Sequence, residues 1–225
     1  MSTSSLKKAN SPVKKTGQTS GLKKRLLKTK QKELLLGREK ILMAARECFA
    51  KRGFSGTSIK DIQQASGFSR GNLYHHFKTK EEIVHIIITQ NLGRFCDRIE
   101  AILTKTDSEQ LAFKDVLKEL AAFAEEITKG PGKGMAFHVW SLSVVDSDIK
   151  NTVLIYFDRI CSALEKQVVL QQSKGIIAKN KNSKELAKAL FGIVVPGFTV
   201  QSVLMDQASI NANTYIDCLS VLLKD

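Results

Sequence analysis

The sequence has few cysteines and shows no strand pattern. Its 225 residues include four cysteines, none of them in a C-x-x-C pair, and no secretory signal precedes them. Widely separated cysteines of this kind are typical of reduced, mostly buried thiols in a cytosolic protein, with a thiol-reactive sensor as the alternative. Segments in which apolar and polar residues alternate are missing as well. We therefore expect an all-α fold of about nine helices.

Motifs of catalysis and metal binding are also missing. The chain has no Walker loop, no G-x-G-x-x-G and no G-x-S-x-G. None of its four histidines has Asp, Glu or Cys companions at the spacing of metal ligands; they are His75, His76, His85 and His138. We therefore predict that the chain is not an enzyme and that it needs neither a metal ion nor a cofactor.

One long uncharged run tests whether the chain crosses a membrane. Residues 189–205 contain no charge, but a spanning helix needs about 20 predominantly apolar residues. This run is shorter and includes Pro196, two glycines and several polar side chains. We predict no membrane partner and a cytoplasmic location.

Positive charge is concentrated at the front of the chain. Net charge is +9 over residues 1–36 and +6 over residues 37–80, but −2 over residues 81–225. A basic front half on a nearly neutral back half indicates a polyanionic partner for the front half only.

Residues 57–80 have the pattern of two short helices separated by a tight turn. Ser58 and Asp61 have the spacing of a capping box, which predicts the start of the first helix. Gly67 suits the left-handed conformation that ends it, and Ser69 is a typical cap for the second helix. Two capped helices joined by a short turn predict a helix-turn-helix.

Polar side chains crowd the exposed side of the second of these helices. Arginine is suited to the guanine edge and asparagine to the adenine edge, so Arg70 and Asn72 are candidates for reading bases. Four further residues are candidates for phosphate contacts: Ser69, Tyr74, His75 and Lys80. The alternative is a small surface hairpin whose polar residues are merely solvated.

The segment REKILMAARECFAKRGFSGTSIKDIQQASGFSRGNLYHHFKTKEEIV, residues 38–84, resembles the DNA-binding domain of TetR-family transcriptional regulators. The match is continuous and covers about a fifth of the chain. The resemblance implies DNA contacts from the two helices and from the start of the fourth helix. The implied contact residues are Thr57, Ser58, Ser69, Arg70, Asn72, Tyr74, His75 and Lys80.

We expect three regions along the chain. Residues 1–36 form a basic, largely disordered arm, although leucines and lysines from Leu22 to Leu36 could extend the next helix backward. The arm either touches DNA phosphates and an adjacent minor groove or only solubilises the protein. Residues 37–84 form the helix-turn-helix DNA-binding domain, and residues 85–225 a helical effector-binding and dimerisation domain. Helices are expected over 39–51, 80–104, 109–129, 135–145, 148–173, 183–205 and 210–223.

The last two helices carry more apolar surface than a surface helix needs. This pattern predicts packing against a second copy of the chain, and the resemblance implies the same, since TetR-family proteins dimerise through their last two long helices. Pro196 should kink the first of the two helices. The predicted interface residues are Leu190, Phe191, Val194, Phe198, Gln201, Tyr215 and Leu219.

An effector pocket is implied by the resemblance, because TetR-family members commonly bind a small molecule in the C-terminal domain. Apolar and aromatic side chains with few polar groups are typical of such pockets. The alternative is that they are ordinary core residues. The candidates are Met135, Phe137, His138, Trp140, Tyr156 and Phe157.

Together these patterns predict a homodimeric DNA-binding regulator, foremost a repressor that a small-molecule effector releases from a palindromic operator in double-stranded DNA. One alternative is a nucleic-acid-binding protein without sequence preference, driven by the basic arm. Another is a helical ligand-binding protein or enzyme with an incidental basic front.

Overall fold

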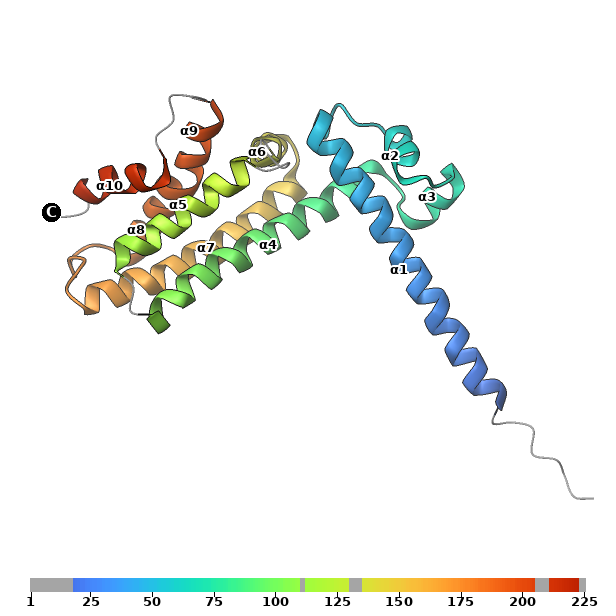
Figure 1. The fold of residues 1–225 in the computed structure, drawn as a ribbon, viewed down its shortest axis with the longest axis horizontal. Helices are drawn as coiled ribbons and strands as arrows, with labels where there is room; N and C mark the ends of the chain where they lie inside the picture. Colours follow the sequence, from blue (N-terminus) through green and yellow to red (C-terminus); the bar gives the residue numbers. More distant parts are fainter. Residues whose placement is uncertain (1–17, 110–111, 130–134, 205–210, 223–225) are drawn as a thin grey trace, which may run out of the picture.

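In the computed structural model, every regular element among the described residues is helical, which confirms the all-α prediction (Figure 1). The structure describes residues 18–109, 112–129, 135–204 and 211–222. The elements are α1 (Gln18–Arg52), α2 (Ile59–Ser66), α3 (Arg70–His76), α4 (Lys80–Glu109), α5 (Phe113–Lys129), α6 (Met135–Val145), α7 (Ser147–Ser173), α8 (Ser183–Gly192), the π-helical turn η1 (Ile193–Gly197), α9 (Phe198–Leu204) and α10 (Ala212–Leu222). Across these helices, none combines the length and apolar character that a membrane span needs.

Helix α1 is much longer than the 39–51 segment expected from the apolar stripe. It begins at Gln18, so residues 18–36 of the predicted disordered arm are helical. The correction has a local cause: lysine, leucine and glutamine favour helix, and the helix from Gly37 onward supplies the nucleus that an isolated segment lacks. Its first half stands away from the rest of the molecule (Figure 1), and Leu34, Leu35 and Leu36 are exposed there.

Helices α2 and α3 pack with the second half of α1 around a small core. Phe49, Ile62, Leu73 and Phe77 are buried there, and Phe54 closes the core with its ring edge-on to Phe49 at 4.9 Å. The apolar positions spaced three and four apart in the sequence therefore face inward, as predicted. This packing leaves the polar side of α3 exposed.

Helix α4 joins the two halves of the molecule. Its first turns add Ile83, Ile87 and Ile88 to the core of α1–α3, and its later turns add Cys96 and Ile99 to a second core formed with α5, α7, α8 and α10. Because one rigid helix contributes to both cores, the boundary expected at residue 84 lies inside a continuous element. A displacement of α4 must therefore shift side chains in both cores.

The helix expected over residues 183–205 is divided into α8, η1 and α9. Pro196 lies inside η1, where its missing N–H and its ring prevent a regular α-helical bond. The hydroxyl of Tyr215 on α10 donates a hydrogen bond of 2.8 Å to the carbonyl of Ile193 in this turn. The predicted local disturbance at Pro196 is thus confirmed, and α10 stabilises it.

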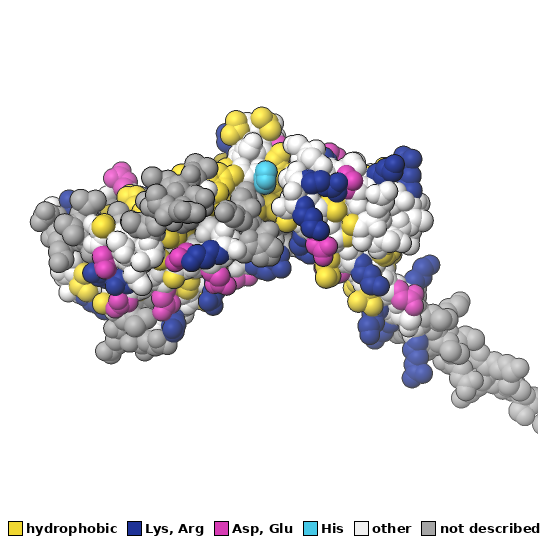
Figure 2. All heavy atoms as spheres, turned by 45° about the horizontal axis from the view of Figure 1, so that its top comes forward, with side chains coloured by type: hydrophobic (Ala, Val, Ile, Leu, Met, Phe, Trp, Pro, Cys, Tyr) yellow, Lys and Arg dark blue, Asp and Glu magenta, His cyan; other side chains and the backbone are white. Residues whose placement is uncertain are grey.

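Lysine and arginine side chains stand out over the α1–α3 part of the surface in Figure 2, whereas basic and acidic side chains alternate over the larger helical part. This distribution agrees with the charge asymmetry of the sequence.

Candidate nucleic-acid interface and interdomain pocket

Hydrogen bonds at the start of α2 fix this helix relative to the end of α1. Ser58 and Asp61 form a complete capping box: the Asp61 N–H donates to Ser58 Oγ at 3.2 Å, and the Ser58 N–H donates to Asp61 Oδ2 at 2.8 Å. Arg52 at the end of α1 also donates to Asp61, at 3.1 Å. Gly67 then ends α2 with a φ of 72°, which a glycine adopts without strain.

Thr57 is placed differently from the prediction of a DNA contact. Its side chain is only 1% exposed, and its hydroxyl lies 2.9 Å from the carbonyl of Gly53 and 3.2 Å from that of Cys48. Because the Thr57 hydroxyl is buried and its hydrogen points at the last turn of α1, it cannot contact a DNA phosphate. The structure therefore corrects Thr57 to a residue that ties α2 to α1.

The other predicted residues of α3 lie on its exposed side. Ser69 caps the helix by accepting the N–H of Asn72 at 3.3 Å, which confirms the predicted cap. The Arg70 guanidinium lies over the Tyr74 ring, 5.7 Å from its centre, while Leu73 between them is buried. Asn72 and His75 are exposed as well. One rigid helix therefore presents an arginine, an asparagine, a tyrosine and a histidine to solvent.

Lys80, at the start of α4, points back toward the loop between α1 and α2. Its ammonium donates to the carbonyls of Phe54 and Thr57, both at 3.1 Å. These bonds hold the loop between α1 and α2 against α4. The remaining N–H of the ammonium is the part that could meet a phosphate.

A groove lies between α3 and the middle of α1. It is lined by Lys30, Lys40, Asn72, His75 and residues around them. A Cβ on Gly37 would lie 2.9 Å from Nε2 of His76, so this position needs glycine for the two helices to approach. Partial burial of the ring, together with His75 and Arg38 beside it, keeps the pKa of His76 below its ordinary value. His76 therefore packs between the helices, whereas His75 is exposed.

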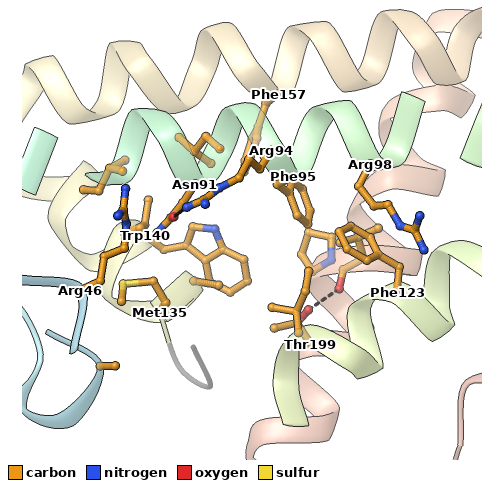
Figure 3. Close-up of a pocket in the computed structure, with 18 of the residues that line it drawn as sticks. Arg46, Asn91, Arg94, Phe95, Arg98, Phe123, Met135, Trp140, Phe157 and Thr199 are labelled. Atoms are coloured by element: carbon orange, nitrogen blue, oxygen red, sulfur yellow. Dashed lines mark hydrogen bonds between the residues drawn. The ribbon is translucent and has the colours of Figure 1, made fainter. Parts of the chain in front are cut away.

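A cavity of about 560 Å³ lies where α1, α4, α6 and the η1 turn meet. Its walls are mostly apolar, and Phe157 on the wall packs against both cores. Figure 3 shows the indole of Trp140 and the rings of Phe95 and Phe123 around the space. Other wall residues are Ile88, Leu92, Ile127, Met135, Val139, Phe191, Val195, Pro196 and Thr199.

Most of the charged groups at this cavity are arginines. Arg46 comes from α1, and Arg94 and Arg98 come from α4, against a single carboxylate, Glu47. Burial and the neighbouring Arg94 lower the pKa of Arg46, and Glu39 opposes this shift. Arg94 donates to the side-chain oxygen of Asn91 at 2.7 Å, and Arg46 donates to Gln90. Within the part of the chain that the structure describes, no three His, Cys, Asp or Glu side chains gather to hold a metal ion.

Comparison with known proteins identifies the front half. Residues 41–87 match the family of bacterial regulatory proteins called the tetR family. The HTH-type transcriptional regulator UidR of Escherichia coli is 45% identical over 69 residues, which are 29% of this chain and 35% of UidR. Residues 41–87 are therefore similar in sequence to the tetR family of bacterial regulatory proteins. The HTH-type transcriptional repressor AcnR of Corynebacterium efficiens is 34% identical over 62 residues, or 28% of this chain and 33% of AcnR.

These matches span about a third of the length of the curated TetR-family relatives. Solved structures extend the likeness over the whole fold. Salmonella enterica GusR is 27% identical, with a TM-score of 0.65 over 85% of this chain and 97% of GusR. FadR of Bacillus subtilis, solved with stearoyl-CoA, has a TM-score of 0.65 at 18% identity over 83% of this chain and 97% of its own, which supports the fold alone. The curated relatives UidR and AcnR are described as transcriptional regulators.

Three of the six residues predicted for a TetR-type effector pocket line the cavity: Met135, Trp140 and Phe157. Phe137 lies outside and packs edge-on against Trp140, with ring centres 5.2 Å apart. The other two are elsewhere. His138 packs against Phe54 and Gly53, at the end of α1, and Tyr156 lies against Gly93 of α4.

The sequence prediction missed Arg46, Arg94 and the η1 residues of the cavity. Arg46 follows the buried pair Ala44 and Ala45 in the apolar stripe of α1, and this position beside a core face was the available signal. The apolar stripe itself could not reveal that α6 would fold over it.

The predicted interface residues require a correction. Leu190, Phe191, Val194 and Phe198 are buried within the protomer, among side chains of α5, α7 and α10, so they have no surface to offer a second copy. Tyr215 is partly buried and packs on Phe198. Gln201 and Leu219 lie outside the side chains that the structure describes. The apolar stripe was real, but α7 covers its α8 part, and α5 and α10 cover its η1 and α9 part.

Proposed function

We propose that the protein is a sequence-specific DNA-binding repressor that acts as a homodimer and is released from its operator by a small molecule. The exposed side of α3 is the observation that carries the proposal. Helix-turn-helix proteins place the N-terminal residues of this helix in the major groove. Arg70 and Asn72 are exposed there, and Ser58, Ser69, Tyr74, His75 and Lys80 flank them as phosphate-contact residues.

The long basic α1 adds a second electrostatic contact to this proposal. Lys28, Lys30 and Lys32 are exposed on its first half, and Lys30 borders the groove beside α3. Lysines at such a place attract phosphates whatever the base sequence. The arm accordingly raises affinity for all DNA, while α3 selects the sequence.

Dimerisation is assigned to the exposed side of the packed pair α7 and α8. Ile155 on α7 is 69% exposed and Ile193, the first residue of η1 directly after α8, is 44% exposed, and Val169 on α7 and Val200 on α9 are exposed as well. Exposed apolar residues on two neighbouring helices mark an interaction surface. A two-fold dimer built there meets a two-fold symmetric site in DNA.

Selection of bound duplexes from a random pool at about physiological salt tests the DNA-binding proposal. An enriched inverted repeat is the expected result, because weak phosphate binding is suppressed under these conditions. Binding without any enriched sequence, falling steeply with salt, would favour the arm-driven alternative.

The dimer surface has its own test in Ile193→Asp, measured by analytical ultracentrifugation. The new carboxylate should convert the dimer to monomer and abolish binding to the inverted repeat. The matched control is Val144→Asp on α6, because Val144 is 84% exposed outside this surface and should stay dimeric. A dimer that survives Ile193→Asp would move the interface elsewhere.

The cavity supplies the effector site of the proposal. Its volume of about 560 Å³ lies within the roughly 300–1,000 Å³ typical of small-molecule sites. It touches α1 of the DNA-binding domain as well as α4, so a ligand that fits one arrangement of these helices better shifts the population toward it.

A further inference from the structure

The arginines of the cavity specify a ligand chemistry more closely than its apolar walls do. Arg46 and Arg94 both lie at the Trp140 end of the cavity, whereas Arg98 lies at the other end, beyond Phe123 (Figure 3). In the described chain neither Arg46 nor Arg94 is paired with a carboxylate in a salt bridge. Two like charges beside an apolar space repel each other, and an anion between them would relieve the repulsion.

A second feature of Arg46 is a hydrogen-bond donor that is not satisfied. Its Nε is buried and has no acceptor among the described residues, although its terminal nitrogen donates to Gln90. A buried donor without an acceptor costs free energy, and folded proteins usually satisfy such groups. A ligand oxygen at this end would accept this hydrogen bond.

The rest of the space offers almost nothing polar. Asn91 already accepts a bond from Arg94, and the Thr199 hydroxyl donates to the Val195 carbonyl at 2.8 Å. Glu47, the remaining charged group, is an exposed residue of α1. An uncharged sugar-like ligand would leave its hydroxyl groups unpaired in such a chamber.

We propose that the effector is an amphipathic anion, with its apolar body among Phe95, Phe123 and Phe157 and its anionic head between Arg46 and Arg94. This inference rests on the proposed function, since it names the effector class of that cavity. The head joins α1 of the DNA-binding domain to α4 directly. Occupancy therefore biases the position of α1 relative to α4, and with it the α3 helix that packs on α1.

The test titrates the full-length protein with twelve-carbon probes and follows the fluorescence of Trp140, the single tryptophan of the chain. Dodecanoate should bind at least about tenfold more tightly than dodecanol, because hydrogen bonds to charged groups contribute that much. Dodecyltrimethylammonium should bind more weakly than dodecanol. A parallel titration with dodecyl phosphate shows whether a carboxylate or a phosphate is the better head. Equal affinities for the anionic, neutral and cationic probes would overturn the proposal.

Four variants, one of them a control, locate the head. Arg46→Gln and Arg94→Gln should each weaken dodecanoate about tenfold while leaving dodecanol unchanged, and Arg46→Lys should recover part of the loss. Arg98→Gln is the matched control at the far end and should change dodecanoate affinity less than about twofold. Unchanged dodecanol binding shows that the cavity is intact in each variant. A loss in Arg98→Gln as large as in Arg46→Gln would refute the assigned head position.

Measuring release from DNA distinguishes a failure of this inference from a failure of the proposed function. On the selected inverted repeat, dodecanoate should lower the affinity of the wild type but not of Arg46→Gln. If the repeat is bound specifically and no anion binds the cavity, the effector class is wrong while the DNA-binding function stands. If no repeat is enriched but dodecanoate binds between the arginines, the proposed function fails and the anion site stands.

Discussion

The recognition element of α2 and α3 and the cavity behind it differ in how many distant parts of the chain each one needs. The recognition element is held by bonds between residues close in sequence, such as Ser58 with Asp61 and Ser69 with Asn72. The cavity takes its walls from α1, α4, α5, α6, α7, α8 and the η1 turn. An element held by local bonds keeps its geometry when remote helices move. The shape of the cavity, in contrast, changes with every shift among the helices that line it. This contrast suits one region to reading DNA and the other to sensing a ligand.

The largest expected effect comes from breaking the recognition element at its core. Leu73→Ala removes a fully buried side chain of α3 and should lower the free energy of unfolding by about 2–5 kcal/mol. Urea unfolding followed by circular dichroism measures the change. Leu34→Ala on the exposed part of α1 is the matched control and should stay within about 0.5 kcal/mol of the wild type. Similar losses in both variants would contradict the packing described for α3.

A smaller effect is expected from removing the base-reading arginine. Arg70→Ala should cost about 1–3 kcal/mol on the selected repeat and relax the preference at one base position. Titration of both the repeat and a scrambled duplex measures it. The unfolding free energy should be nearly unchanged because Arg70 is exposed. Equal losses on the two duplexes would refute its role in reading bases.

Loss of a helix cap should have a still smaller effect on the free energy of unfolding. Ser69→Ala removes the acceptor for the Asn72 N–H and should cost about 1 kcal/mol of unfolding free energy. Ser69→Gly should cost only a few tenths of a kcal/mol, which makes it a control for the hydroxyl itself. Thermal unfolding at neutral pH distinguishes the two variants. If α3 were held by tertiary packing alone, both would behave as the wild type.

The smallest expected effect is a pH dependence at the start of α2. Hydrogen bonds from the Ser58 hydroxyl and N–H, aided by Arg52, hold the pKa of Asp61 below its ordinary value. A carboxyl with a depressed folded pKa stabilises the protein above its unfolded pKa of about 3.9 and loses that contribution as pH falls through the folded pKa. The stability gap between wild type and Asp61→Ala should therefore narrow below about pH 4. A gap that stays constant from pH 7 to pH 3 would contradict this origin.

The same contrast explains what could be predicted from the sequence. The caps at Ser58 and Ser69 and the turn at Gly67 are local signals, and the structure confirms them. The extension of α1 before residue 39 was only one of two expectations for residues 22–36, because this part of the helix has no apolar partner to mark it.

Features that depend on distant contacts were harder to predict. The apolar stripe of Leu190, Val194 and Phe198 shows that a face is buried but not which neighbour buries it, and α5, α7 and α10 do so here. Arg46 looks like an ordinary surface residue of α1 until α4 and α6 are placed beside it. The proposed anion site therefore emerges only from the assembled fold.

The most direct test of the account is the ratio of affinities for the selected repeat and a scrambled duplex, measured for the wild type and for an arm variant. The arm variant carries Lys28→Gln, Lys30→Gln and Lys32→Gln, three exposed positions on the first half of α1. If α3 reads the sequence and the arm only attracts phosphates, both affinities fall and the salt slope decreases, while the ratio stays at the wild-type value. A ratio that collapses toward one in the arm variant would show that sequence preference resides in the arm and would contradict the account.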